Sequence, residues 1–152
     1  MTTGHCLCGA VRVTITDLPR DFGICHCKMC QRWTGLAFAA IEVPDAQVTV
    51  EGEEHVSRYR SSDISTRSFC RICGSTLWFR DDGRPSYEIP VGLLDDADHL
   101  RLTHEIFVDR KPDGWGLAGD HPRETEQDYF RRKGHVPQPA SRPASPAEGG
   151  QP

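Results

Sequence analysis

The sequence predicts a mainly β protein, built of antiparallel β-sheets with one or two short helices. Apolar and polar residues alternate with a period of two from position 11 to 15, which is typical of a strand with one buried face. Short apolar runs are separated by turn-forming pairs such as Glu51–Gly52 and Asp82–Gly83. No long helical pattern alternates with these runs, so a parallel sheet of the α/β type is not expected.

The expected strands follow one another along most of the chain. Val11, Val13 and Ile15 share one face of the first strand, and the apolar run over 36–43 is typical of a buried strand. A further turn signal, Pro-Asp-Gly at 112–114, follows the last strand. The strands are expected at 11–15, 36–43, 48–50, 56–60, 76–80, 87–91 and 105–108.

Two short helices complete the predicted secondary structure. One is expected to follow Cys27 and to run to Thr34, and the other is expected over 124–133. The second helix ends in the densest basic run of the chain, at 131–133. Cations suit the C-terminal end of a helix because the helix dipole is negative there. A small patch for anions or nucleic acid is the alternative interpretation.

The length of 152 residues predicts one domain. Residues 1–136 have a globular composition, whereas 137–152 contain five prolines and no large apolar side chain. A segment of that kind cannot bury enough surface to offset the entropy lost on ordering. We therefore expect a globular domain over 1–136 and a flexible tail, rich in Pro, Ala, Ser and Gly, over 137–152.

The composition excludes several classes of protein. Lys and Arg number 18 against 22 Asp and Glu, and the resulting net charge of −4 argues against a nucleic-acid partner. No stretch approaches the ~18 apolar residues of a membrane span, and the start lacks the basic and apolar regions of a signal peptide. These features predict a cytoplasmic protein with no membrane partner. Seven cysteines, an odd number in a reducing compartment, make a disulfide framework unexpected.

The seven cysteines fall into three clusters, at 6–8, 25–30 and 70–73. Cysteines at i and i+2 of an extended chain point to the same side, so a Cys-x-Cys pair aims two sulfurs at one point. The third cluster is followed by Gly74 and is typical of a metal knuckle, because glycine lets the chain turn beneath the thiolates. Seven ligands divide into a closed four-thiolate zinc site, which is structural, and a three-thiolate zinc site with an open position, as in catalytic sites.

Three other interpretations of the cysteines stay open at this point. They could be free thiols packed as small apolar residues, or ligands of an iron–sulfur cluster. Cys70 and Cys73 could form a redox pair, although the βαβ unit in which such pairs usually occur is absent. The clustering of every cysteine favours Zn²⁺ over all three.

Three motifs hold all seven cysteines: Gly-His-Cys-Leu-Cys-Gly-Ala-Val at 4–11, Cys-His-Cys-Lys-Met-Cys at 25–30 and Phe-Cys-Arg-Ile-Cys-Gly-Ser at 69–75. In this order they resemble the glutathione-dependent formaldehyde-activating enzyme family, which also includes centromere protein V. The sequence also resembles the family at 91–96 and at 106–108, and again at Lys111 and Trp115. The resemblance therefore covers about residues 4–115.

The resemblance implies a particular fold and two metal sites. The fold would be a β-tent, a set of antiparallel sheets pinned by zinc, here over the domain 1–136. One zinc would be structural, and the second, held by the catalytic cysteines, would keep an open position. The structural site would consist of Cys6, Cys8, Cys70 and Cys73, and the second site of Cys25, Cys27 and Cys30.

The reaction implied by the resemblance is that of a carbon–sulfur lyase similar to S-(hydroxymethyl)glutathione synthase. The thiolate of glutathione, or of another small thiol, would take the open zinc position and add to formaldehyde or a related aldehyde. His26 is a candidate proton donor, with a supporting role between the ligands as the alternative. Lys28 and Arg32 are candidates for contacts with the glutathione carboxylates and Trp33 for a pocket wall, with surface or core roles as the alternatives.

Two other functions stay open. The chain could be a non-catalytic, zinc-stabilised binding module or a glutathione carrier, or it could sense oxidants through the cysteines of the second site. Two departures from the family pattern concern the substrate pocket. The segment 116–122 lacks the expected aromatic residues, and Glu105 stands where the family pattern begins with histidine, with His104 displaced by one position.

Overall fold

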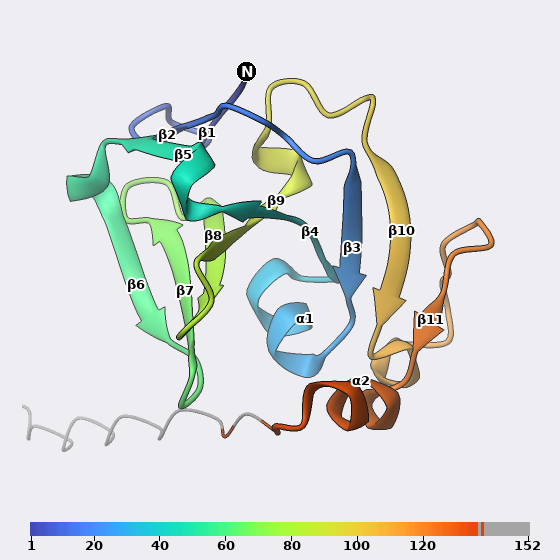
Figure 1. The fold of residues 1–152 in the computed structure, drawn as a ribbon. Helices are drawn as coiled ribbons and strands as arrows, with labels where there is room; N and C mark the ends of the chain where they lie inside the picture. Colours follow the sequence, from blue (N-terminus) through green and yellow to red (C-terminus); the bar gives the residue numbers. More distant parts are fainter. Residues whose placement is uncertain (137, 139–152) are drawn as a thin grey trace, which may run out of the picture.

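The computed structural model describes residues 1–136 and 138 and has the predicted mainly β architecture. Within these residues, eleven strands form two sheets (Figure 1). The small sheet, in the order β1-β2-β5, consists of β1 (Thr2–His5), β2 (Arg12–Ile15) and β5 (Val48–Glu51). The large sheet, in the order β11-β10-β3-β4-β9-β8-β7-β6, consists of β3 (Asp21–Cys25), β4 (Phe38–Pro44), β6 (Val56–Arg60), β7 (Ser65–Cys70), β8 (Thr76–Asp81), β9 (Ser86–Pro90), β10 (Arg101–Ile106) and β11 (Arg123–Glu124).

The expected antiparallel pairing holds for most of the sheet, but two strand pairs of the large sheet are parallel. β10 runs parallel to β3 and to β11, whereas its other strand pairs are antiparallel. A parallel pair needs a crossover rather than a hairpin turn. Here the chain leaves β9, passes through 91–100 and enters β10 alongside β3 (Figure 1). Turn signals in the sequence predict hairpins, so they do not predict a connection of this length.

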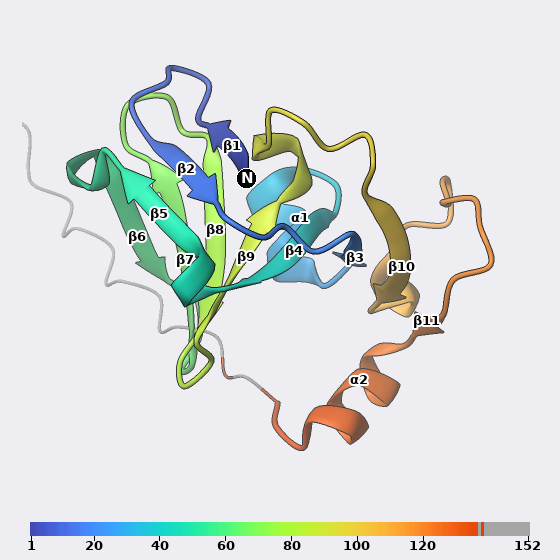
Figure 2. The same cartoon turned by 45° about the horizontal axis from the view of Figure 1, so that its top comes forward.

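The hydrophobic core lies between the small sheet and one face of the large sheet (Figure 2). Val11, Val13 and Ile15 are buried, as their alternation predicts, and Arg12 between them is exposed. They belong to one cluster with buried side chains of the large sheet, namely Ile41, Val43, Leu77, Trp78 and Ile89. The face of β7 and β8 that points away from this core carries side chains that do not belong to the cluster.

Most of the predicted strands are confirmed. β2, β4, β5, β6, β8 and β9 lie at or within a few residues of the expected ranges. The strand expected at 105–108 instead begins at Arg101 and ends at Ile106, because Phe107 adopts a left-handed conformation with φ of 60°. β1, β3, β7 and the two-residue β11 escape the sequence pattern, since their residues are largely polar or mixed and show no apolar alternation.

Both predicted helices are confirmed. α1 (Lys28–Thr34) begins directly after Cys27, whose side chain accepts a backbone hydrogen bond in the first turn. α2 (Glu126–Lys133) begins with a capping box formed by Thr125 and Asp128, and its last turn carries the basic run. Neither helix of the described part of the chain is long and apolar enough to cross a membrane.

The position of α1 decides where the functional side chains meet. In Figure 1, α1 lies between the β6–β8 side of the molecule and the β3–β10 side, and α2 lies below it. The segment after α2 reaches the turn between β6 and β7, where the backbone N–H of Gln138 donates to a carboxylate oxygen of Asp63 at 2.9 Å. The tail expected over 137–152 otherwise falls outside the described residues.

Candidate metal centres and substrate cavity

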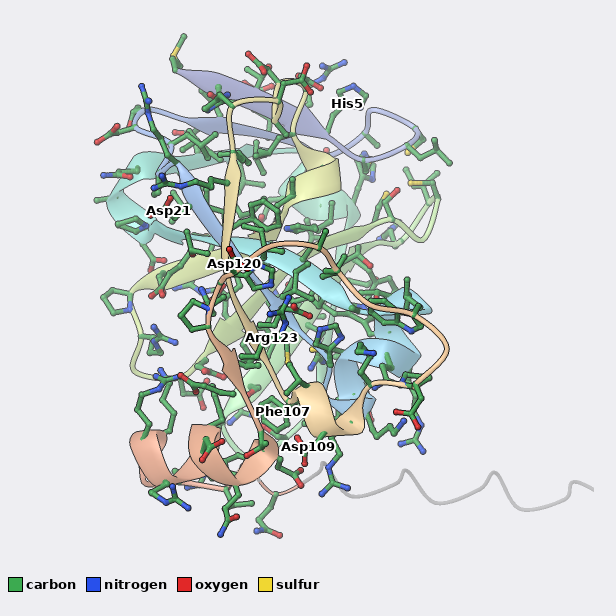
Figure 3. All side chains as sticks on the ribbon, turned by 90° about the vertical axis from the view of Figure 1, so that its right-hand side faces the viewer. His5, Asp21, Phe107, Asp109, Asp120 and Arg123 are labelled. Carbon is green, nitrogen blue, oxygen red and sulfur yellow. The ribbon has the colours of Figure 1, made fainter. Side chains whose placement is uncertain are left out.

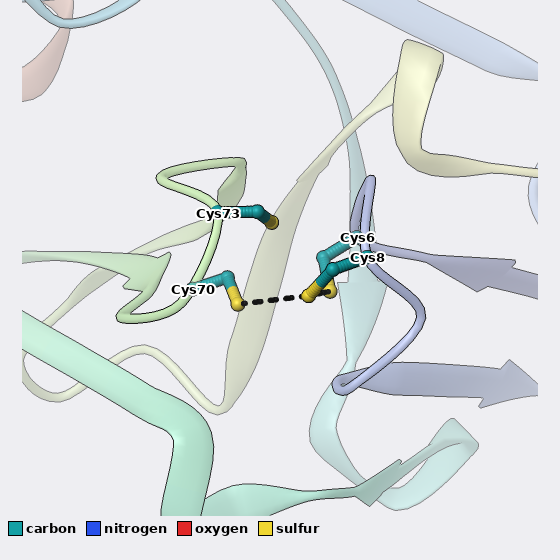
Figure 4. A group of neighbouring side chains, drawn as sticks. All are labelled: Cys6, Cys8, Cys70 and Cys73. Atoms are coloured by element: carbon teal, nitrogen blue, oxygen red, sulfur yellow. Dashed lines mark hydrogen bonds between the residues drawn. The ribbon is translucent and has the colours of Figure 1, made fainter.

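In the structure the seven cysteines form two clusters, and the first of these, the four-cysteine cluster, joins the two sheets. Cys6 and Cys8 lie in the loop after β1, while Cys70 ends β7 and Cys73 lies in the turn that follows (Figure 4). All four sulfurs lie within 4.8 Å of one another. The structure thus brings together the four residues that the resemblance assigns to one site, across a separation of more than sixty positions.

The geometry of this cluster fits a tetrahedral metal ion. The Sγ atoms of Cys6 and Cys8 are 3.5 Å apart, and those of Cys8 and Cys70 are 3.8 Å apart. Four thiolates bound to zinc at ~2.3 Å would have their sulfurs ~3.8 Å from one another. Gly74 has a φ of 76°, so it makes the turn that the sequence analysis expected of it.

Hydrogen bonds within the cluster favour the thiolate form that a metal requires. The backbone N–H of Val11 donates to the Cys6 sulfur at 3.3 Å. The side chain and backbone of Ser75 lower the pKa of Cys73 to about 5, and the Ser75 hydroxyl lies 3.2 Å from the Cys73 sulfur. The thiolate, not the thiol, is the metal ligand. The surrounding chain therefore favours the thiolate form at Cys6 and Cys73. Despite a backbone hydrogen bond at Ala10, burial and the neighbouring sulfurs raise the pKa of Cys8 to about 12.

The second cluster lies where β3 passes into α1. Cys25 ends β3, Cys27 precedes α1 and Cys30 lies in its first turn, and their three sulfurs lie within 4.8 Å of one another. Hydrogen bonds from the thiols of Cys25 and Cys30 lower the pKa of Cys27 to about 3. The same contacts raise the pKa of Cys25 and Cys30, so Cys27 is the most acidic thiol of the three. Together the three sulfurs offer a metal soft ligands.

A buried arginine, which the sequence analysis did not single out, stands beside this cluster. Two guanidinium nitrogens of Arg67, on β7, lie 3.8 and 3.7 Å from the Cys30 sulfur. The guanidinium carbon lies 4.7 Å from the ring centroid of Trp33 and 5.0 Å from that of Phe79. Its charge also helps to lower the pKa of Cys27. A single arginine in a polar strand gives no motif, so no sequence signal marks it.

A cavity of about 290 Å³ opens beside Arg67. None of the seven cysteines lines it, but Arg67 contacts Cys30 of the three-cysteine cluster and Gly74 directly follows Cys73 of the four-cysteine cluster. The lining residues are Trp33, Tyr59, Arg67, Phe69, Gly74 and Thr76. Trp33 thus lines a cavity, as the sequence analysis proposed for it.

Neither Lys28 nor Arg32 lines this cavity. The sequence analysis considered both as candidates for contacts with glutathione, with a surface role as the alternative. Both are exposed on α1, and the ammonium group of Lys28 donates to the side-chain oxygen of Gln31 at 3.0 Å. The helix directs Cys30 inward and these longer side chains outward, which the spacing of the motif alone did not reveal.

His26 is fully buried between the two ligand positions of the Cys-x-Cys pair. Its Nε2 atom lies 2.7 Å from a carboxylate oxygen of Glu105, and its ring centroid lies 5.2 Å from that of Trp115. This environment agrees with a supporting role for His26, the alternative raised by the sequence. Its neighbour Glu105 is one of the positions that depart from the family pattern.

Glu105 is the centre of a buried polar network. Besides His26, its carboxylate accepts hydrogen bonds from Nε2 of His121 at 2.6 Å and from Nε of Arg123 at 2.9 Å. Although burial raises the pKa of Glu105, the hydrogen bonds from His121, His26 and Arg123 bring it below its usual value. Arg123, labelled in Figure 3, also donates to two backbone carbonyls of the preceding loop. The segment that departs from the family is therefore fastened to β10 at Glu105.

Comparison with known proteins agrees with the cysteine pattern. The family model described as glutathione-dependent formaldehyde-activating enzyme matches residues 1–110. An uncharacterized lyase of Schizosaccharomyces pombe is 32% identical over 116 residues, which are 76% of this chain and 84% of the relative. The crystal structure of a Rhodobacter sphaeroides protein, a structural genomics target, matches with a TM-score of 0.53 at 22% identity, over 80% of this chain and 98% of that chain. At this identity the last likeness establishes a shared fold alone.

Proposed function

This chain belongs to the glutathione-dependent formaldehyde-activating enzyme family, and we propose that it is a zinc-dependent carbon–sulfur lyase. The reaction would join glutathione, or another small thiol, to formaldehyde or a related aldehyde. The observation that carries this proposal is the three-cysteine cluster beside an open cavity. The lyase named in Schizosaccharomyces pombe supports the same class of enzyme.

Zn²⁺ is the metal that we propose for both centres. Clusters made of thiolates alone favour soft metals over Mg²⁺ or Ca²⁺. Cys6, Cys8, Cys70 and Cys73 would hold a structural ion, since four ligands close a tetrahedron. Cys25, Cys27 and Cys30 would hold the second ion with one position open, and an ion there would lower the pKa of a substrate thiol.

The residues around the second centre prepare the reaction. Trp33 and Phe69 give the cavity apolar walls, which limit the access of water to the reacting groups. In the addition, a bond forms between sulfur and the aldehyde carbon while the carbonyl π bond breaks, and the thiol proton ends on the new hydroxyl. His26 is held by Glu105, so we assign it to positioning the cysteine loop and assign proton delivery to water at the cavity mouth.

The test combines metal content with the rate of adduct formation. We expect about two zinc ions per chain and an exchange between glutathione and ¹³C-formaldehyde, followed by NMR, that is faster than in buffer. Cys27→Ala should lose about one zinc ion and the rate enhancement together, while circular dichroism stays unchanged. Equal exchange rates for the native protein, the variant and buffer would contradict the proposal. Glutathione binding without any acceleration would instead favour a carrier.

A further inference from the structure

Arg67 is buried, yet its charge is not matched by a carboxylate. Its relative exposure is 4%, and no ion pair joins it to an Asp or Glu of residues 1–136 or to residue 138. Within the described residues its Nε atom is buried without any hydrogen-bond partner. Burying a guanidinium is unfavourable unless its N–H groups find acceptors. A side chain kept in such a state is prepared for an acceptor that comes from outside the fold.

The orientation of Arg67 is set by the groups around it. Its guanidinium lies near the rings of Trp33 and Phe79, which attract a cation through their faces. The terminal nitrogens contact the Cys30 sulfur at 3.7 and 3.8 Å, a pair of long contacts that leaves other N–H groups of the fork unused. Arg67 is therefore held in place by the rings and the sulfur while it retains donors for a ligand.

The cavity next to Arg67 has the character of a site for a small anion. At about 290 Å³ it lies at the lower end of the range for ligand pockets. Among its lining residues only Arg67 carries a formal charge, and most of the others are aromatic. A planar guanidinium recognises a carboxylate through two parallel hydrogen bonds, a geometry that lysine cannot offer.

We propose that Arg67 binds a carboxylate of the substrate, so that the enzyme prefers thiols or aldehydes that carry a carboxylate a few bonds from the reacting atom. This inference rests on the proposed function, because the contact with Cys30 places Arg67 at the second centre. The carboxylate could belong to a mercapto acid or to a 2-oxo acid. Arg67 is then a specificity residue for the small substrate in the cavity.

The first experiment measures thiol binding by calorimetry with the zinc-loaded, full-length protein. The matched probes are 3-mercaptopropionate and 3-mercapto-1-propanol, which differ mainly in the carboxylate. We expect the acid to bind about tenfold more tightly or better, and Arg67→Gln to reduce this ratio to near one. Arg67→Lys should retain part of it, because a point charge replaces the fork. Arg58→Gln, an exposed site on β6 paired with Glu53, is the control and should keep the native ratio.

The second experiment locates the carboxylate on the aldehyde instead. With glutathione as the thiol, the acceleration over buffer is compared for glyoxylate and glycolaldehyde. A preference for glyoxylate that disappears in Arg67→Gln supports an oxo-acid substrate, and a preference confined to the thiol pair supports a mercapto acid. Zinc content and circular dichroism are measured for each variant, and the comparison in the native protein stands even if Arg67→Gln misfolds.

The results separate this inference from the proposed function. Equal affinities in the thiol pair and equal accelerations in the aldehyde pair overturn the role of Arg67, and Arg67 then only balances the charge of the thiolates. If adduct formation from glutathione and formaldehyde persists in that case, the proposed function stands. If the zinc-loaded protein binds no thiol and accelerates no addition, both the proposed function and the role of Arg67 are contradicted.

Discussion

At the scale of single residues, two buried charges organise the second centre from opposite sides. Arg67 contacts the Cys30 sulfur from β7, and Glu105 holds His26 from β10. Neither residue is a proposed metal ligand, and each lies on a strand remote in sequence from the cysteines that it serves. The cysteine loop is therefore fixed by charges on both sides, which makes the network around Glu105 a direct target for a stability experiment.

We expect Glu105→Gln to destabilise the protein although it changes no volume. The substitution removes the negative charge that pairs with Arg123 and hydrogen-bonds to His26 and His121, at a position where Glu105 is 1% exposed. Removing one partner of a fully buried pair costs about 3–5 kcal/mol. We expect the loss here to lie at the lower end of that range, because the Arg123 side chain is 40% exposed. Urea unfolding measures the loss, and Glu53→Gln, which removes only an exposed ion pair with Arg58, should cost less than about 1 kcal/mol. Similar losses in the two variants would show that the network contributes little.

The sequence identified the residues of both centres that occur in motifs but not those that act alone. Spacing places all seven cysteines in three clusters, and the resemblance to a known family divides them into a set of four and a set of three. The structure brings the cysteines together in these two sets. Arg67 stands alone among small polar residues of β7, and Glu105 gains its role from partners up to 79 positions away. Contacts of that range depend on tertiary structure. Neither residue belongs to a motif or a periodic pattern from which such contacts could be predicted.

At the scale of elements, β7 links the two centres. Arg67 faces α1 and the second cysteine cluster, and Cys70 at the end of the same strand belongs to the first cluster. Phe69 and Gly74 line the cavity between them. This strand was missing from the sequence prediction because its apolar content is low, since one of its faces serves the site rather than the hydrophobic core.

The turn after β5 provides a test of how tightly the small sheet is closed. Gly52 has a φ of 77°, and a Cβ atom there would lie 1.9 Å from the carbonyl oxygen of Ala10. Gly83 has a similar φ of 73° but has open space around it. We expect Gly83→Ala to cost about 1–2 kcal/mol from backbone strain alone. Gly52→Ala should cost clearly more, because the backbone of Ala10 must move as well.

Thermal and urea unfolding of the two glycine variants provide the measurement. A Gly52→Ala protein as stable as Gly83→Ala would mean that the loop before β2 shifts without loss, and that the small sheet is closed less tightly than its register indicates. The comparison is informative because both variants add one methyl group at a left-handed position and differ only in what that group meets.

At the scale of the whole molecule, the four-cysteine centre connects parts that the chain itself leaves far apart. Cys8 and Cys70 are separated by 62 positions, and their sulfurs meet between the loop of the small sheet and the end of β7. A metal bound there would close a long loop and hold the two sheets against their shared core. Apparent binding free energies of structural zinc, about 10–16 kcal/mol, are comparable with the entire stability of a domain.

The two centres should therefore differ in what their metal does for the fold. The three-cysteine cluster spans only the short segment from the end of β3 to α1, so loss of its ion should leave the two sheets assembled. We predict that a chelator added in steps releases zinc in two phases, monitored with a metallochromic dye. The first phase should leave the near-ultraviolet circular dichroism unchanged, and the second should coincide with unfolding.

Cysteine variants assign the two phases to the two centres. Cys27→Ala should lack the first phase and unfold cooperatively with a midpoint close to the native one, whereas Cys8→Ala should be strongly destabilised or fail to fold even with excess zinc. Both variants remove one sulfur, so the difference between them reports the length of chain that each metal closes. Equal destabilisation by the two variants, or simultaneous release of both ions with unfolding, would mean that the second centre is also part of the structural framework. In that case the zinc ion proposed to bind the substrate thiol would also be required for folding.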